Sequence, residues 1–537
     1  MRHLLTNISR LSASCLPAHR AIPLFLASTA ILSLQLQVET PLLPQLAPVT
    51  LGLQLVILVL ALPSCKLPED NATRLTLAAL LLLFGWSLLS SWWSLFPDLV
   101  LRRSLLILVP SIGLFLLAAT DIKPERTFRS VATFICGLAV FLSVVALLLS
   151  VRPTIAGQSG LFSFQALTVG PLTLSQKLMG GGWPFSVSSL THNPNTFAVW
   201  VMLGLISAWG LCRTRYVPTS LAIIAVMFLG FGIWLSFSRG VLGSMAVATA
   251  AVFALGPIRR LPVALPPARI LSLAALVLAV AVIAGVILVP PLAEDVLGLL
   301  LDAETLKYQT VTAQRTLQFG VLGLIALVAT TWLLLSNSLV PRDSKSSTVI
   351  KLAAAFAIVL FAVSLVTLVL PLADTIALAY LEDSGGSVRI EVWRQLLHYS
   401  AGNFMLGSGF GTSFEAILLP AGFESGAFNI YLAILAETGV VGFVLFAGIW
   451  AVPIWITANN YRSAVRRRSG KADREFHGPL GCIACLLFAI GANQFLELGI
   501  MRYNFLNFFW IAYLGQGLAL TRQRVDDSAL SRDKPLG

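Results

Sequence analysis

The stretch from Ser425 to Gly442 reads SGAFNIYLAILAETGVVG and combines a membrane-like helix with polar residues. Its middle is apolar enough to enter a bilayer, yet it carries Asn429 and Glu437. A charged side chain inside a membrane span is costly unless it faces a polar cavity or a partner. The stretch therefore predicts a membrane helix whose acid has a specific role, either structural or functional.

The whole chain has the composition of a polytopic membrane protein. Of its 537 residues, 57% are hydrophobic and 11% are charged, and the mean hydropathy is +0.87. Soluble domains carry about 25% charged residues. Apolar runs of about 20 residues, long enough to cross a bilayer core, recur along the chain. We predict an all-α bundle of about 14 transmembrane helices, with at least about 12. They are expected near residues 21–36, 43–63, 75–93, 100–119, 130–150, 193–211, 218–236, 240–256, 270–290, 316–336, 350–371, 428–456, 479–496 and 503–520.

The basic residues set the expected orientation of this bundle. Most of the 36 Lys and Arg residues fall in cytoplasmic segments if both termini lie inside, among them the cluster YRSAVRRRSGKADRE. Cytoplasmic loops of membrane proteins carry an excess of Lys and Arg, so we predict an N-in, C-in topology. The net charge of +12 then arises from basic residues in short cytoplasmic loops, which contact anionic lipid head groups. It does not indicate nucleic-acid binding.

The six cysteines fall in helices or on the cytoplasmic side, which gives no sign of a disulfide framework. Cys482 and Cys485 match C-x-x-C inside an apolar span, and we interpret them as small residues at a helix contact.

We divide the chain into three parts. Residues 1–189 hold the N-terminal transmembrane helices and a first external loop, and residues 190–456 hold a core with a large external loop at 372–427. Residues 457–537 hold a C-terminal hairpin and a cytoplasmic tail. The external segments near 151–192 and 372–427 are too long for simple turns, and such loops are usually functional or disordered.

The second external loop contains a predicted amphipathic helix, SVRIEVWRQLLHYS, with apolar residues at helical spacing on one side. Such a helix suits a lipid surface, with Trp393 inserted there. The following LGSGFGTSF carries Gly407, Gly409 and Gly411, which permit tight turns. Their amides suit an anion-binding nest, and a flexible connection back to the membrane is an equally good interpretation of the glycines alone.

Two sets of arginines are candidates for binding an anionic substrate. Arg239 lies beside Ser238 in the short external turn LSFSRGVLGS, on the side where the positive-inside rule disfavours cations. Arg389 and Arg394 lie on the amphipathic helix, where a guanidinium suits phosphate oxygens. The structural alternatives are an arginine that extends to the lipid heads and a solvated face paired with Glu391.

Two further polar sets lie at the same predicted membrane face. The segment THNPNTFAVW places His192 and Asn193 there, where they suit sugar hydroxyls, and Asn195 as a helix cap. Asn429 and Glu437 form the other set, with an ion pair to an Arg as the structural alternative for the acid. Polar residues of the last hairpin are possible partners, namely Glu497, Arg502, Asn504 and Asn507.

The chain resembles the O-antigen ligase and polymerase membrane family over roughly residues 190–450. The matching pieces are THNPNTFA, SFSRGVLGS, RIEVWRQLLHYSAGNFMLGSGFGTSF and FNIYLAILAETGVVGFVLF. The resemblance implies an inverting, metal-independent glycosyltransferase without a cofactor. Its donor would be a glycan linked to undecaprenyl diphosphate, and its acceptor a lipid A core or a polysaccharide. The family's site faces the periplasm from the bacterial inner membrane.

The resemblance also implies site residues. Arg239 and Arg389 match the family's arginines around the diphosphate, and Asn429 and Glu437 match its Asn-x2-Leu-x4-Glu-x-Gly pattern. The family usually has a His before this Asn, as the candidate that activates the acceptor hydroxyl, whereas this chain has Phe428. The remaining candidates for the proton acceptor are Glu424, His192, His398 and Glu437, and we favour Glu424.

Two other functions fit parts of the sequence. A transporter or flippase for lipid-linked oligosaccharide is one, although transporters tend to place charges near the membrane midplane and to contain internal repeats. A non-catalytic member of a glycan assembly complex is the other, favoured by Phe428.

Overall fold

The computed structural model describes most of the chain outside residues 252–383. The described residues are 16–33, 37–38, 43–65, 68–150, 155–156, 162–169, 172–179, 186–191, 193–236, 384–423, 426–427, 429–467, 471–496 and 505–532, with scattered positions between 238 and 251. The predicted spans near 270–290, 316–336 and 350–371, and most of 240–256, lie outside these residues. So do His192, Arg239, Glu424 and Phe428.

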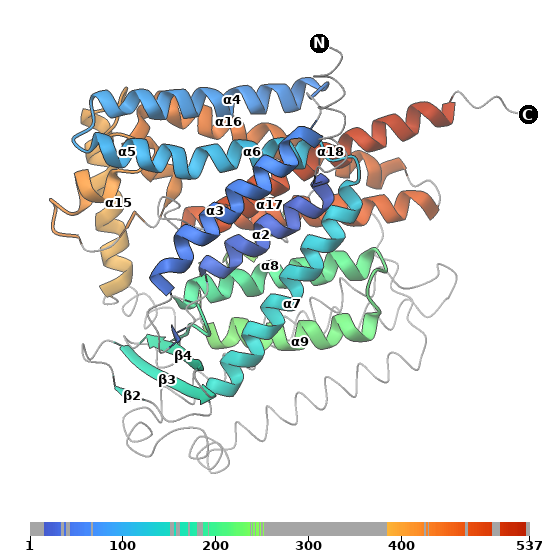
Figure 1. Cartoon of the computed structure of the whole chain (residues 1–537), viewed down its shortest axis with the longest axis horizontal. Helices are drawn as coiled ribbons and strands as arrows, with labels where there is room; N and C mark the ends of the chain where they lie inside the picture. The colour runs from blue at the N-terminus through green and yellow to red at the C-terminus, as the bar shows by residue number, and fades with distance from the viewer. Residues whose placement is uncertain are drawn as a thin grey trace, which may run out of the picture.

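Long helices make up the main body (Figure 1). Every predicted span that lies wholly within the described residues coincides with a helix or with consecutive helical segments. The helices are α2 (Ala18–Ser33), α3 (Leu43–Ala61), α4 (Asn71–Leu89), α5 (Pro97–Arg103), α6 (Val109–Ala119), α7 (Pro124–Ser150), α8 (Pro194–Arg213), α9 (Thr219–Ser236), α15 (Ser384–Gly402), α16 (Ile430–Arg467), α17 (Lys471–Leu496) and α18 (Phe505–Arg532).

Five helical segments among the described residues are long and apolar enough to cross a membrane. They are Asn71–Trp92, Pro97–Ala119, Pro124–Leu149, Pro194–Arg213 and Ile430–Ser463. Two shorter apolar helices, Thr50–Ser64 and Gly478–Gln494, accompany them. The prediction of a multi-pass helical membrane protein is therefore confirmed, while the count of about 14 spans and the N-in, C-in topology stay predictions.

A small antiparallel sheet adds to the predicted helices. It consists of β1 (Gln37–Val38), β2 (Ile155–Ala156), β3 (Phe162–Val169), β4 (Leu172–Met179) and β5 (Ser186–Val187). β3 and β4 form a hairpin in which Phe162 pairs with Met179 and Val169 with Leu172. β2 to β5 lie in the first predicted external loop, and β1 lies between the first two predicted spans. The prediction of an all-α chain missed this sheet.

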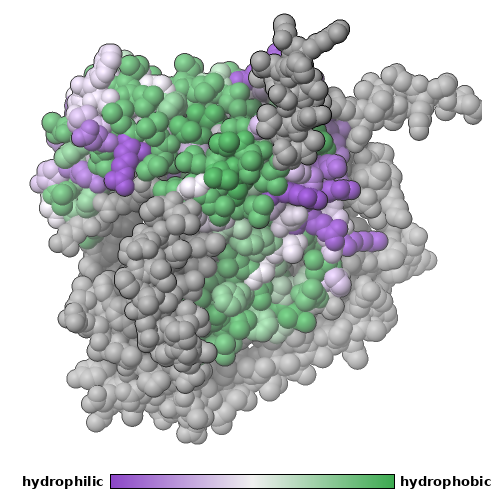
Figure 2. All heavy atoms as spheres, in the orientation of Figure 1, coloured by the Kyte–Doolittle hydropathy of each residue, from purple (hydrophilic) through white to green (hydrophobic). Residues whose placement is uncertain are grey.

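Polar and apolar side chains separate along the bundle. Figure 2 shows a broad apolar surface over the helices, with hydrophilic residues gathered toward two ends. The sheet, α15 and the α4–α5 connection lie toward one end, and the C-terminus lies toward the other (Figure 1). At the latter end Arg522 of α18 lies 3.9 Å from Asp70, the N-cap residue of α4. Segments predicted to be external thus share one end of the bundle.

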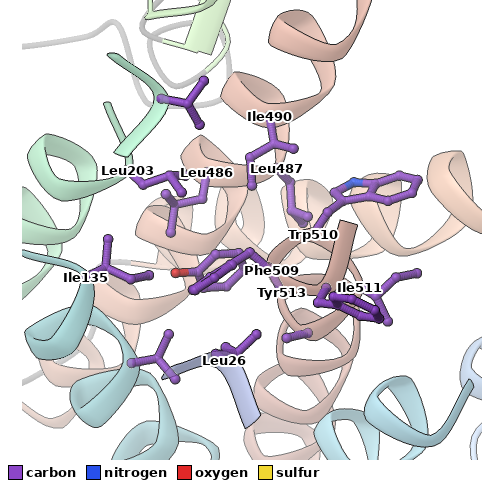
Figure 3. Packing of buried hydrophobic residues seen from close by; sticks show 14 of the residues in the cluster. Leu26, Ile135, Leu203, Leu486, Leu487, Ile490, Phe509, Trp510, Ile511 and Tyr513 are labelled. Atoms are coloured by element: carbon purple, nitrogen blue, oxygen red, sulfur yellow. The ribbon is translucent and has the colours of Figure 1, made fainter. Parts of the chain in front are cut away.

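Tight helix contacts hold the core together. Aromatic residues of α18, among them Phe509 and Tyr513, pack with Leu486 and Leu487 of α17 (Figure 3). Small residues bring the backbones close, as is typical of membrane bundles. A Cβ on Gly210 of α8 would lie 2.6 Å from Cys482 Sγ. Cys482 also donates to the Ile206 carbonyl over 3.2 Å, which supports helix packing as its role.

The contact between α6 and α18 leads to a test at Gly515. A Cβ there would lie 2.7 Å from the Ala118 Cβ and 2.8 Å from the Ala119 backbone nitrogen. We expect Gly515→Ala to lower the free energy of unfolding by about 1–3 kcal/mol, because backbone atoms cannot move aside easily. Thermal unfolding of the detergent-solubilised protein measures this effect.

Gly448→Ala is the matched control, since nothing lies within 4 Å of its Cβ position. Alanine favours a helix over glycine, so this variant should unfold at the wild-type temperature or slightly above it. Equal melting temperatures for the two variants would contradict the packing described for α6 and α18.

Candidate functional site

The helix α16 is interrupted inside its membrane span. Gly439 has φ 64° and ψ −171°, so the helix breaks after Thr438 and resumes at Val440. The break releases carbonyl groups from the helical hydrogen-bond pattern. Within a membrane such groups must find partners in the protein.

A loop from the end of α15 supplies those partners. Ser408 N donates to the Ala436 carbonyl over 2.9 Å, and Gly409 N donates to the Glu437 carbonyl over 2.8 Å. On the far side of the break, Val440 N donates to the Phe404 carbonyl over 2.8 Å. The loop therefore completes the hydrogen bonding of the broken helix.

Close approach explains two glycines at this contact. Gly407 has φ 69°, and a Cβ on it would lie 2.4 Å from the Glu437 carbonyl carbon. A Cβ on Gly439 would lie 2.2 Å from the Met405 carbonyl oxygen. We call residues 407–413, GSGFGTS, the glycine-rich turn. Its prediction as a tight turn is confirmed.

Glu437 fills the inside of the glycine-rich turn. Its Oε2 accepts a hydrogen bond from Gly411 N over 2.8 Å. Its Oε1 accepts from Ser413 N over 3.1 Å and from Ser413 Oγ over 2.5 Å. The side chain has no solvent-exposed surface. Of the two interpretations of these glycines, the structure supports the amide nest, and its occupant is the chain's own carboxylate.

The surroundings of Glu437 define its role. Its described hydrogen-bond partners are backbone amides and a hydroxyl, and Arg103 lies near enough to act on it electrostatically. The alternatives from the sequence were an ion pair with an arginine and a proton-accepting role. A carboxylate enclosed in this way holds the turn and offers no exposed oxygen to a substrate hydroxyl. We therefore interpret Glu437 as a structural residue of the site.

Residues 310–447 match the family model described as O-antigen ligase. This stretch is similar to an O-antigen ligase domain, and we call residues 310–447 the ligase domain. This match confirms the resemblance over residues 310–447, while the pieces around Asn193 and Arg239 lie outside it. The ligase domain includes α15, the glycine-rich turn and the broken helix up to Ala447. The search of curated proteins found no match to the chain.

An arginine outside the ligase domain also contacts the turn. Arg103, at the end of α5, forms a two-pronged ion pair with Glu415, with nitrogen–oxygen distances of 2.8 and 3.0 Å. Its Nη1 also donates to the Gly411 carbonyl. The side chains are only 14% and 21% exposed. Arg103 was not among the residues that the sequence singled out, although a cation near the predicted outer end of a span is unusual.

The amphipathic helix α15 packs on the protein more than the sequence suggested. Val392 and Leu396 are fully buried, in one cluster with Leu418 and Ala433. Trp393 donates from Nε1 to the Ala427 carbonyl over 3.1 Å. The expectation of a helix lying flat in lipid with its Trp inserted is therefore wrong for the middle of the helix, because η4 (Phe414–Leu418) and α16 cover it.

The two arginines of α15 differ in their surroundings. Arg394 is 70% exposed, and its Nη1 lies 2.6 Å from Glu391 Oε2. This ion pair is the surface pairing considered as the structural alternative. Arg389 is partly buried and lies on the same helix. The structure therefore gives Arg394 a described partner at the surface and leaves both residues as candidates for substrate binding.

Asn429 caps the first part of α16, and its side-chain Nδ2 group is buried. Its Oδ1 accepts from Leu432 N over 3.1 Å, and the residue is 1% exposed. Its Nδ2 is buried without a hydrogen-bond partner in the described part of the chain. An unsatisfied donor in a buried position costs about 1–3 kcal/mol, which makes it a candidate contact for a bound group.

The remaining described candidates make local hydrogen bonds. Asn193, and not Asn195, is the N-cap residue of α8, since its Oδ1 accepts from Asn195 N over 2.8 Å. Ser238 is buried and accepts from Val241 N over 3.4 Å. The structure thus places Glu437 inside the glycine-rich turn that follows α15, and Asn429 at the start of α16. It places Asn193 at the start of α8 and Ser238 just after α9.

A small apolar cavity borders the glycine-rich turn at Phe410. Phe410, Ile434, Asn507 and Trp510 are among its lining residues, and its volume is about 40 Å³. That space suits about one water molecule. The cavity is therefore too small for the chain of a lipid donor. Asn507, one of the polar residues singled out in the sequence, lies in its wall.

The position of Glu437 yields a test with a matched control. Glu437→Gln replaces one acceptor by an NH2 group that faces backbone donors, so we expect the free energy of unfolding to fall by about 1–3 kcal/mol. Glu391→Gln makes the same chemical change in an exposed ion pair and should cost less than about 1 kcal/mol. Thermal unfolding of both variants in the same detergent gives the comparison.

A Glu437→Gln variant that melts at the wild-type temperature, or no lower than Glu391→Gln, would show that the carboxylate does not hold the turn.

Proposed function

We propose that the chain is a membrane glycosyltransferase of the O-antigen ligase or polymerase type. It transfers a glycan from undecaprenyl diphosphate to a lipid A core or to a polysaccharide, at the periplasmic face of the bacterial inner membrane. The observation that carries the proposal is the ligase domain itself. Its glycine-rich turn, held by Glu437, lies beside the arginine-bearing helix α15.

In the proposed reaction, a hydroxyl of the acceptor attacks the anomeric carbon of the donor from the face opposite the diphosphate. The new carbon–oxygen bond forms as the bond to the diphosphate oxygen breaks, and the bonding electrons leave with the diphosphate. The anomeric configuration is thereby inverted. Arg389 and Arg239 stabilise the negative charge that grows on the leaving group, and Arg394 and Ser238 contribute further contacts.

The hydroxyl proton needs an acceptor, because Phe428 stands where the family usually has a His. We propose Glu424 for this role, since it lies in the predicted external loop 372–427 that also contains Arg389. His192 is the alternative. The enclosed position of Glu437 makes it the weakest of the four candidates, the fourth being His398 of α15. Asn429 donates its free Nδ2 hydrogen to the bound substrate, and Asn193 and Asn195 contact sugar hydroxyls. The proposed reaction uses no metal and no cofactor.

The interrupted helix also suits a second function, a flippase for lipid-linked oligosaccharide. Transporters use broken membrane helices whose released backbone groups bind substrate or ions. In this chain the released carbonyls of Ala436, Glu437 and Thr438 accept from Ser408 N, Gly409 N and Trp86 Nε1 instead. The break is therefore filled by protein, which favours the transferase.

A transfer assay tests the proposed function directly. The purified protein in lipid nanodiscs receives a glycan-linked undecaprenyl diphosphate and an acceptor glycan. We expect Arg389→Ala and Arg239→Ala each to lower the transfer rate about 100-fold, because each removes a positive charge from the leaving diphosphate. Arg462→Ala is the control, as this exposed arginine lies in the other half of α16.

Full transfer by both the Arg239 and the Arg389 variants would overturn the proposal. The surface glycan of a knockout strain then distinguishes a ligase from a polymerase. Loss of glycan-capped lipid A core indicates a ligase, and single repeat units on the core indicate a polymerase.

A further inference from the structure

We infer that Arg103 is a positioning residue of the transferase, which holds the glycine-rich turn through Glu415 and the Gly411 carbonyl. The inference rests on the proposed function. It also extends the site beyond the ligase domain, because Arg103 lies in the N-terminal part of the chain, more than 200 residues before residue 310.

The peptide groups of Gly411 are held from two directions. The Gly411 N–H donates to Glu437 Oε2, and the Gly411 carbonyl accepts from Arg103 Nη1. Gly411 has φ 79°, and a Cβ on it would lie 2.6 Å from Arg103 Cδ. The arginine therefore lies directly against the backbone of the turn.

The ion pair with Glu415 adds a second point of contact. Both guanidinium Nη atoms reach the carboxylate, a geometry that Lys cannot reproduce. Glu415 belongs to η4, which packs against α15. A shift of this segment would therefore move the helix that carries Arg389. Arg103 thus acts on the proposed diphosphate site through Glu415 and α15.

The neighbouring helix supplies more contacts of the same kind. Phe410 N donates to Ser90 Oγ over 3.1 Å, and Trp93 Nε1 donates to the Leu406 carbonyl over 3.2 Å. Trp86 Nε1 donates to the Thr438 carbonyl over 2.9 Å. The end of α4 and α5 together form a cradle, residues 86–103, for the turn and the broken helix.

The experiment compares Arg103→Ala with Arg102→Ala. Arg102 is the adjacent arginine of α5 and is exposed, so it is a matched control. Amide hydrogen exchange by mass spectrometry follows the peptide covering residues 407–413 in nanodiscs, and the transfer assay gives kcat and KM for the donor. For Arg103→Ala we expect at least about tenfold faster exchange and an at least about tenfold lower kcat, with a donor KM close to wild type. Arg102→Ala should match the wild type in each measurement.

Milder variants keep the test decisive if Arg103→Ala does not fold. Arg103→Lys should keep one contact and give an intermediate exchange rate and kcat, and Glu415→Gln should do the same while Arg103 still reaches Gly411. The double variant Arg103→Ala with Glu415→Ala should be no slower than Arg103→Ala alone, because the pair acts as a unit.

Unchanged exchange at residues 407–413 in Arg103→Ala and Arg103→Lys would overturn the inference. Faster exchange with full kcat would also overturn it, since the arginine would then have a purely structural role. A wild-type protein that transfers no glycan would contradict the proposed function instead. The exchange result would still decide whether Arg103 holds the turn.

Discussion

The carboxylate of Glu437 inside the glycine-rich turn is the interaction on which the rest of the site depends. An acid without exposed surface in a membrane helix requires several donors, and Gly411 and Ser413 provide three hydrogen bonds. These hydrogen bonds also fix the backbone conformation of the loop between α15 and α16. Glu437, whose burial in a membrane helix costs free energy, is thus the residue that holds the glycine-rich turn in place.

The bilayer imposes the second constraint, because a broken helix there needs a partner for every released backbone group. The loop residues 404–409 and Trp86 meet that need at the break around Gly439. The turn and the break therefore depend on each other: the loop completes the helix, and the helix supplies the acid that the loop encloses. Arg103 and the end of α4 hold this unit from the N-terminal part of the chain.

Much of this architecture follows from the sequence, for physical reasons. Span positions follow from apolar runs of bilayer length, and the turn follows from the spacing of Gly407, Gly409 and Gly411. The amide nest was one of two interpretations of these glycines, and its occupant was not foreseen, since Glu437 lies 26 residues after Gly411 and only tertiary structure brings them together. Arg103 is 312 residues from Glu415, and no local pattern reveals a contact across that separation. The apolar residues on one side of α15 suit contact with lipid and with protein equally well. The sequence therefore could not predict that this side packs against η4 and α16.

Amide hydrogen exchange of the wild-type protein in nanodiscs tests the central claim most directly. If Glu437 occupies the glycine-rich turn, the amides of Gly411 and Ser413 exchange as slowly as those of the buried helices, although they lie in a loop. Exchange of these two amides at the rate of an exposed loop would contradict the account.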